Sequence, residues 1–239
     1  EKHNIVHHSF TNIEGVDDDI DLWPLLRVNT AKKKLWFHKY QHIYAPFAYT
    51  LMTYKWLLEK DFKQVVNYNK SDLFKAKDQS LGMVWTKLIV GKLFHFSVFY
   101  ALPMLLGAPW YLVLWGNVVM HVIAGFILSI TFQLAHVVDK AEFPTEEEVQ
   151  NITNIEHQMK TTANFATRNW LVTWYTGGLN FQVEHHMFPT INHIHYPKIA
   201  EIVRKTAAEF ELPYNEYRTT MSAIKGHFRH LRNMGMQPA

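Results

Sequence analysis

The sequence predicts an all-α integral membrane protein with two transmembrane helices, and three observations lead to that prediction. Residues 93–138 contain no Asp, Glu, Lys or Arg, whereas one spanning helix needs about 20 apolar residues. Pro103, Gly107 and Pro109 interrupt this run near its first third and favour a turn between two spans. Of all residues, 48% are hydrophobic and 15% are aromatic. We therefore expect a transmembrane hairpin over residues 84–136, with two buried helices of a soluble α-protein as the alternative.

The distribution of basic residues predicts the orientation of this hairpin. All 24 Lys and Arg residues lie outside residues 93–138, so none lies in the predicted turn. Because cytoplasmic loops are rich in Lys and Arg, both flanks are expected in the cytoplasm and the turn on the far side. The chain then divides into a cytoplasmic segment over residues 1–83, the hairpin over 84–136, and a second cytoplasmic segment over 137–239. The Trp, Tyr and Lys content of residues 40–58 is typical of an interfacial helix.

The composition excludes several classes of protein. The absence of cysteine excludes disulfide scaffolds, thiolate zinc sites and iron–sulfur ligation by Cys. The net charge of +3 comes with scattered basic residues and no nucleic-acid-binding motif, so we expect no nucleic-acid partner. The chain begins at Glu1 rather than Met, directly before a histidine cluster. We therefore expect a C-terminal fragment of a longer protein.

Candidate metal ligands are concentrated at three places in the chain. If residues 2–9 are helical, His3 and His7 lie on one face, while His8 is turned by roughly 100° from His7. The predicted topology also returns His136, at the end of the second span, to the side of the other clusters. The alternative for the first cluster is a surface helix with an incidental histidine pair. The six candidate ligands are His3, His7, His8, His136, His185 and His186.

The residue types of these clusters predict a metal site. Imidazoles without thiolate suit iron, zinc or copper. A catalytic zinc uses three protein ligands and one open position, so six histidines favour two metal ions. The sequence contains neither His-Glu-x-x-His nor Glu-x-x-His, the signatures of common zinc peptidases and of carboxylate-bridged di-iron bundles. We therefore predict a histidine-rich dinuclear site in a cytoplasmic helical cap at the end of the hairpin.

Other polar residues have more ordinary interpretations. The acidic run Asp17, Asp18, Asp19 and Asp21 is expected to be a solvated loop, from which one carboxylate can orient a ligating imidazole. For His95 and His121, which lie inside the predicted spans, interhelical hydrogen bonds are expected rather than metal binding.

Start and stop signals predict three helices in the second cytoplasmic segment. Pro144 and Thr145 predict a helix over residues 146–160. Pro197 predicts an amphipathic helix that ends near residue 210. A last helix is expected over residues 217–233, with its basic side chains along one side.

Two motifs resemble those of a known family. The first is His3-x-x-x-His7-His8 followed by Thr11-Asn12-Ile13, and the second is Gly177-Gly178-Leu179-Asn180-Phe181-Gln182-x-x-His185-His186-x-Phe188-Pro189. Together they resemble the second and third histidine boxes of the membrane fatty acid desaturases. Gln182 stands where many members have a histidine, which resembles the front-end, delta-6-like (linoleoyl-CoA) subgroup. The resemblance covers essentially the whole chain, including the tail from His195-Tyr196-Pro197.

The resemblance implies a four-span, multi-pass membrane enzyme whose active site faces the cytoplasm. Two non-haem iron ions would use dioxygen and two electrons to introduce a double bond into a fatty acyl chain. The acyl group would be carried on CoA or on a lipid, and the electron donor would be of the cytochrome b5 or ferredoxin type. The family's first histidine box is absent from this chain, so the fragment by itself is expected to be inactive.

The resemblance also implies roles for particular residues. His3, His7 and His8 match the second box, and His136 matches a further ligand after the last span. The third box is matched by Gln182, His185 and His186. Gln182, Asn180 and Asn164 are expected as metal ligands or as residues next to the ligands, and Trp174 as part of the substrate channel. His193 and His195 are expected to be structural or to support the ligands.

Two alternatives remain open from the sequence. A related membrane di-iron hydroxylase or ketolase shares the histidine boxes, although the Gly-Gly-Leu-Asn-Phe-Gln context favours desaturation. A zinc-dependent membrane hydrolase or receptor would use the same histidines without redox chemistry.

Overall fold

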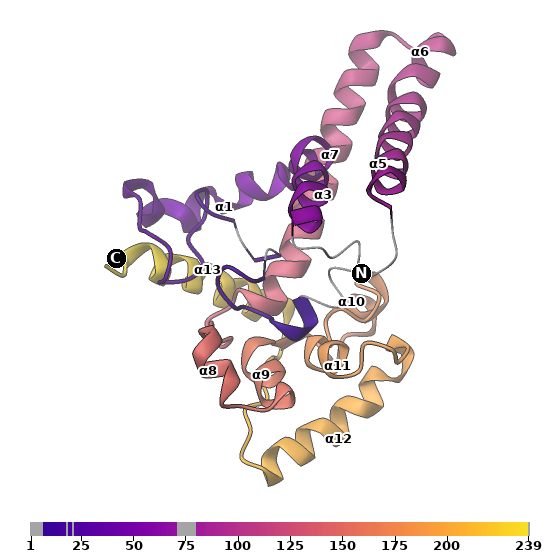
Figure 1. Ribbon diagram of the computed structural model, residues 1–239. Coiled ribbons are helices and arrows are strands. Elements are labelled where there is room, and N and C mark those ends of the chain that lie inside the picture. Colours follow the sequence, from indigo (N-terminus) through magenta and orange to yellow (C-terminus); the bar gives the residue numbers. More distant parts are fainter. Residues whose placement is uncertain (1–6, 18, 21, 71–79, 239) are drawn as a thin grey trace. The chain divides into compact units, whose positions relative to one another are not determined.

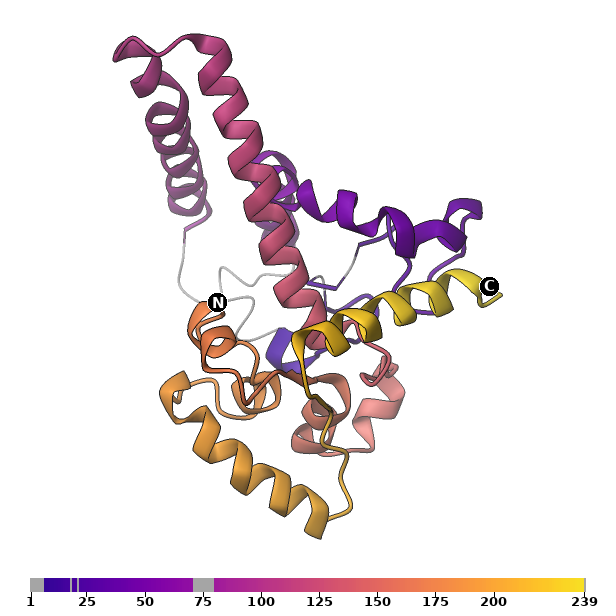
Figure 2. The same ribbon diagram turned by 180° about the vertical axis from the view of Figure 1, so that it is seen from behind.

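A computed structural model describes the whole chain except residues 1–6, 18, 21, 71–79 and 239. The described residues are mostly helical and form two compact units (Figures 1 and 2). The first unit contains residues 1–45 and 130–239, and the second contains residues 46–129. The second unit holds α2 (Met52–Lys55), η3 (Trp56–Lys60), α3 (Asp61–Lys70), α5 (Leu81–Phe96), η4 (Ser97–Ala101), α6 (Leu102–Leu105) and most of α7 (Trp110–His136). The helix α1 (Gln41–Thr50) begins in the first unit and ends in the second.

The second unit contains the predicted hairpin. The elements α5, η4 and α6 form one continuous helix over Leu81–Leu105, and α7 covers Trp110–His136. Both are long and apolar enough to cross a membrane, and Figures 1 and 2 show them side by side. The turn lies at residues 106–109, where Gly107 adopts a φ of 93° that favours glycine. The prediction of two membrane-length helices joined at this turn is confirmed.

The first long helix carries a paired charge within its length. Since α5 begins at Leu81, it includes Lys92, and the Lys92 Nζ atom lies 2.5 Å from Asp61 Oδ2 of α3. An ionised side chain at membrane depth is costly unless it is paired. The ion pair with Asp61 therefore makes Lys92 compatible with a helix of this composition.

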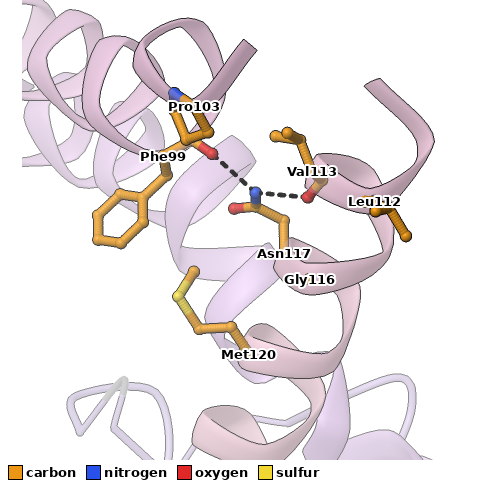
Figure 3. A pocket seen from close by; sticks show the side chains of 7 residues that line it. All are labelled: Phe99, Pro103, Leu112, Val113, Gly116, Asn117 and Met120. Atoms are coloured by element: carbon orange, nitrogen blue, oxygen red, sulfur yellow. Dashed lines mark hydrogen bonds between the residues drawn. The ribbon is translucent and has the colours of Figure 1, made fainter. Parts of the chain in front are cut away.

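Polar side chains also join the helices of the second unit. The Asn117 amide of α7 donates to the carbonyl oxygens of Phe99 and Val113, both at 2.9 Å (Figure 3). It borders a cavity of about 210 Å³ that apolar residues otherwise line. His121 Nδ1 lies 3.1 Å from the Thr53 hydroxyl of α2, which is the interhelical hydrogen bond that the sequence predicted. Such bonds hold helices together where apolar surface alone gives little specificity.

The first unit is built around a small core at the end of α7. Its helices and strands are η2 (Trp36–Tyr40), α8 (Glu146–Gln150), α9 (Asn154–Thr161), β1 (Asn164–Phe165), α10 (Trp170–Tyr175), α11 (Gln182–Met187), η5 (His193–His195), α12 (Tyr196–Glu209), β2 (Glu216–Tyr217) and α13 (Thr220–Met236). Leu134 and Val138 pack with Phe165 and Tyr217. The strands β1 and β2 pair in parallel, which departs from the purely helical prediction.

Helix boundaries in this unit follow local capping signals. The predicted helix over residues 146–160 is wrong as a single element, because α8 and α9 are separate and the Thr153 hydroxyl caps the second one. The prediction of a helix at Pro197 is confirmed by α12. The last helix begins at Thr220 rather than residue 217, since Thr219 caps it and Tyr217 is paired in β2.

Hydrogen bonds from Arg27 hold the C-terminal end of α13. The buried Arg27 guanidinium donates to five backbone carbonyls, which include those of Met234 and Gln237 at the end of α13. A cation near the last carbonyls of a helix is stabilising. At Gly235 the helix approaches the backbone of η2 so closely that a Cβ atom would overlap the His38 carbonyl oxygen.

We predict that Gly235→Ala destabilises the protein by about 1–3 kcal/mol, because the added methyl group must displace backbone atoms. Thermal unfolding of the detergent-solubilised protein would measure the loss. The matched control is Gly82→Ala, where a Cβ atom meets nothing within 4 Å. Equal melting temperatures for the two variants would contradict the close packing of α13 on η2.

Candidate metal centre

Three histidines from distant parts of the chain meet in one buried cluster. His7 lies in a helical turn near the start of the described chain, His136 is the last residue of α7, and His186 lies in α11. One ring nitrogen from each residue lies within 4.8 Å of the others. The Nε2 atoms of His7 and His136 are 3.3 Å apart. The fold therefore unites the three loci from which the sequence predicted a single site.

Two further candidate ligands border this trio. The His8 ring stacks on the His186 ring, with 4.2 Å between the centroids. The His185 ring lies 4.7 Å from the His8 ring, on the same side of the cluster. Five of the six predicted ligands thus form one continuous group of imidazoles. The sixth, His3, lies outside the described residues.

A carboxylate orients one of the three central imidazoles. His7 Nδ1 donates to Asp17 Oδ2 at 2.8 Å, and both side chains are buried. The backbone N–H of Asn12 donates to the same oxygen at 3.0 Å. With its proton held on Nδ1, His7 presents the lone pair of Nε2 to His136 and His186. Asp17, from the acidic run, therefore supports one of the candidate ligands, an arrangement common around metal-binding histidines.

A second supporting residue, Gln158, was missed by the sequence reasoning. Its Oε1 atom accepts hydrogen bonds from His186 Nδ1 and from the Thr11 hydroxyl, both at 2.8 Å. This places the proton of His186 on Nδ1 and leaves its Nε2 lone pair facing the cluster. A single glutamine on a short helix gives no sequence signal for such a role, because its partners lie 28 and 147 residues away.

The donor atoms of the cluster fit a metal ion. Among the residues that the structure describes, His186 Nε2 is buried without a hydrogen-bond partner, which is costly unless something binds it. Burial and the neighbouring imidazoles lower the pKa of His186 well below its usual range, so the ring is neutral near pH 7. Neutral imidazole is the form that binds metals. His7, His136 and His186 would hold one ion, with His8 and His185 beside them.

The amide residues of the motif over residues 177–189 occupy different environments. Gln182 begins α11, donates from Nε2 to the Leu179 carbonyl oxygen at 2.8 Å, and keeps a buried Oε1 atom with no partner among the described residues. Asn180 is instead hydrogen-bonded to Thr173 and Thr176 of the preceding turn. Only Gln182 therefore has an oxygen available for a metal or a bound water.

The other predicted residues lie away from the trio. Asn164 uses its amide to bind Glu184 and Tyr214, and its oxygen accepts from the Val183 N–H. Trp174 is largely exposed on α10, and His193 and His195 are exposed on η5. The structure does not bring these side chains into the imidazole cluster.

A buried carboxylate fixes α11, the helix that carries His185 and His186. Glu184 accepts hydrogen bonds from Asn164 Nδ2 at 2.8 Å and from the Tyr214 hydroxyl at 2.9 Å. Burial raises the pKa of the Glu184 carboxyl, although these hydrogen bonds oppose the shift. The residue directly before His185 is thus held by two partners from outside α11.

A buried group of imidazoles that could hold a metal ion, at the end of a helix long and apolar enough to cross a membrane, is compatible with a helical metal protein of membranes. The particular family follows from sequence comparison. The family described as fatty acid desaturase matches residues 1–218, so the chain belongs to the fatty acid desaturase family. The family resemblance predicted from the two histidine motifs is confirmed.

Individual relatives agree with this assignment. The chain is 36% identical over 242 residues to the acyl-lipid (8-3)-desaturase of Physcomitrium patens, covering 99% of this chain and 50% of the relative. It is 34% identical to the sn-1 linoleoyl-lipid 6-desaturase of Arthrospira platensis over 99% of this chain and 64% of the relative. The sn-1 linoleoyl-lipid 6-desaturase of Synechocystis sp. is also 34% identical, over 98% of this chain and 66% of the relative.

These relatives are longer than the chain, which spans between half and two thirds of their length. No solved structure matches the chain significantly.

We predict that Gln158→Leu lowers metal affinity by about 10–100-fold, because His186 loses the acceptor that orients its ring. Metal content of the purified protein, measured across a series of chelator concentrations, would show the loss. Gln158→Glu keeps an acceptor oxygen at this position and is expected to retain the metal.

The matched control is Gln150→Leu, the same change at an exposed glutamine of α8. Wild-type metal content in Gln158→Leu, or an equal loss in Gln150→Leu, would contradict a specific role for Gln158.

Proposed function

We propose that this chain carries the histidine-rich part of a membrane fatty acid desaturase that introduces a double bond into an acyl chain. The observation that carries the proposal is the convergence of His7, His136 and His186 in one buried cluster of a desaturase-family chain. The metal ligands proposed are the five described imidazoles together with His3, and Gln182 is proposed as a ligand to metal or to bound water.

The proposed substrate is a fatty acyl group on a lipid, desaturated on the carboxyl side of an existing double bond. The names of the relatives, acyl-lipid and linoleoyl-lipid desaturases, support the lipid-linked form over acyl-CoA. The glutamine at position 182 supports the front-end assignment, as the sequence resemblance implied. Regioselectivity would follow from how the acyl chain is held against the cluster.

In the overall reaction the acyl chain loses two hydrogen atoms. Dioxygen accepts these hydrogens together with two protons and two electrons, and two water molecules form. When bound, two iron ions would supply the redox chemistry with dioxygen that an unactivated C–H bond requires. The electrons would come from a donor of the cytochrome b5 or ferredoxin type.

Residues of this chain would orient the imidazoles and exclude water from the reaction site. Asp17 and Gln158 fix the ring orientations of His7 and His186, so that the lone pairs converge before any ligand binds. Precise placement of reacting groups is a large part of catalytic power. Buried side chains around the cluster would keep water from the reacting carbon atoms.

The proposed topology places the cluster at the cytoplasmic surface of the membrane. Residues 1–83 and 137–239 would be cytoplasmic on either side of the hairpin over 84–136, in a protein with four spans in all. The absence of Lys and Arg from the turn supports this orientation.

Neither alternative class is favoured by an observation. A hydroxylase or ketolase would share the imidazole cluster, but the relatives are named desaturases. A non-redox zinc protein would use the same ligands, but membership of the desaturase family argues for redox chemistry.

Expression of the complete reading frame in a host that supplies linoleoyl lipids and an electron donor is expected to add a double bond on the carboxyl side of an existing one. Mass spectrometry that locates double bonds would detect the product. His186→Ala should abolish it and lower the iron content, because the variant lacks a central imidazole.

Hydroxylated products would replace the proposal by the hydroxylase alternative. Product formation by His186→Ala at the wild-type rate would refute the role of the cluster. Full zinc occupancy without iron would favour the non-redox alternative.

We also predict that a tag inserted at Ala108 reacts only with reagents added from the non-cytoplasmic side, because the turn lacks the basic residues of cytoplasmic loops. Labelling of intact and permeabilised cells would measure this. The control is a tag after Met236, in the proposed cytoplasmic segment over residues 137–239. This tag should react only after permeabilisation. The reverse pattern would overturn the topology.

A further inference from the structure

The short helix α10 exposes an unusually apolar face. Four of its six residues are large, apolar or aromatic, and exposed, with Trp170 at 77% and Trp174 at 73%. Leu171 directly follows Trp170, and Tyr175 directly follows Trp174. Because the four side chains have the spacing i, i+1, i+4 and i+5, they share one side of the helix. No other part of the first unit's chain between residues 137 and 239 places two exposed tryptophans together.

The opposite face of α10 packs against the end of the membrane-length helix. Val172 lies against the core cluster that contains Leu134 and Val138, and Ile130 packs against the same cluster. Residues 130–136 are the last two turns of α7. Therefore α10 lies beside the point at which α7 ends, with its aromatic face directed away from the core.

The length of α7 places this point at the membrane surface. Its 27 residues extend for about 40 Å, whereas the hydrocarbon core is about 30 Å thick. Trp110 and Tyr111 are exposed at the first turn of α7, as is typical of an interface. With that end at one interface, the last turns of α7 emerge at the other, at the level of Val172.

The chemistry of the exposed face fits a lipid interface. Trp and Tyr combine an apolar ring with a polar N–H or O–H and are enriched where acyl chains meet headgroups. The exposed Arg168, two residues before Trp170, adds a cation that suits anionic headgroups. We propose that Trp170, Leu171, Trp174 and Tyr175 insert into the headgroup boundary of the bilayer that α7 crosses, so that α10 is an interfacial anchor.

The anchor is joined tightly to the helix that bears His185 and His186. Asn169 caps α10, and the Asn180 side chain binds the hydroxyls of Thr173 and Thr176 in its last turns. The turn that follows contains Gly178, whose φ of 82° favours glycine and which packs against His193. The depth of α10 would therefore set the depth of the imidazole cluster relative to the acyl chains, a consequence that rests on the proposed function.

Electron paramagnetic resonance of spin-labelled protein tests the anchor independently of activity. The complete protein, with its other cysteines replaced, is labelled at Trp170→Cys or Trp174→Cys and placed in nanodiscs of phosphatidylcholine and phosphatidylglycerol. The control is Phe210→Cys, since Phe210 is 70% exposed at the end of α12. Collisions of each label with dissolved oxygen and with a water-soluble nickel chelate report its depth.

At positions 170 and 174, oxygen is expected to collide more often than the nickel chelate, and the order should reverse at position 210. Nickel accessibility at 170 and 174 equal to that at 210 would overturn the proposal. Labels that are immobile and reached by neither reagent would also overturn it, because protein rather than lipid would then cover the face.

A second measurement avoids cysteine variants that fail to fold. Brominated lipids should quench the tryptophan fluorescence of the wild-type protein more than that of Trp174→Phe, and the difference is the contribution of Trp174. A difference of zero would refute insertion of this side chain. Neither outcome depends on whether the protein desaturates a lipid.

Discussion

The imidazole cluster depends on the buried side chain of Asn12. Its amide nitrogen lies within hydrogen-bonding distance of three backbone carbonyl oxygens, so that one of its two N–H groups is shared between two of them. These carbonyls belong to His136 at the end of α7 (3.0 Å), Glu142 in the segment that follows (3.0 Å) and Thr161 at the end of α9 (3.2 Å). Asn12 has a φ of 60°, a conformation that Asn tolerates better than most residues. Leaving such buried carbonyls without a donor costs about 1–3 kcal/mol each. One side chain thus joins the segment that follows His7 and His8 to the end of the membrane-length helix.

Buried polar groups near Asn12 orient the imidazoles of His7 and His186. The Asp17 carboxylate is hydrogen-bonded to His7, whereas the neutral Gln158 amide and the Thr11 hydroxyl contact His186. The two imidazoles are therefore oriented by groups of different charge. His7 Nδ1 and His186 Nδ1 are satisfied by Asp17 and Gln158 on the side away from the shared centre, so that these two buried rings keep hydrogen-bond partners.

Helix α7 is both a membrane-length helix and a part of the imidazole cluster. Its apolar length suits a bilayer, and its last residue, His136, is part of the cluster. Val172 of α10 packs near this end, while Glu184 fixes α11 through Asn164 and Tyr214. The end of α7, the packing of α10 and the orientation of α11 therefore concern neighbouring parts of the first unit.

Much of this protein could be predicted from sequence because the relevant signals are local. A long run without charge predicts membrane-length helices, Pro103, Gly107 and Pro109 predict their turn, and Pro197 predicts α12. Adjacent histidines predict ligands because few other roles need two imidazoles side by side. The sequence could not show which carboxylate of the acidic run reaches a ligand, nor that Gln158 orients His186. Those choices, like the break between α8 and α9 and the pairing of β1 with β2, depend on competing local caps or on contacts between residues far apart in the chain. Tertiary structure decided them because such contacts exist only after folding has placed the side chains within hydrogen-bonding distance.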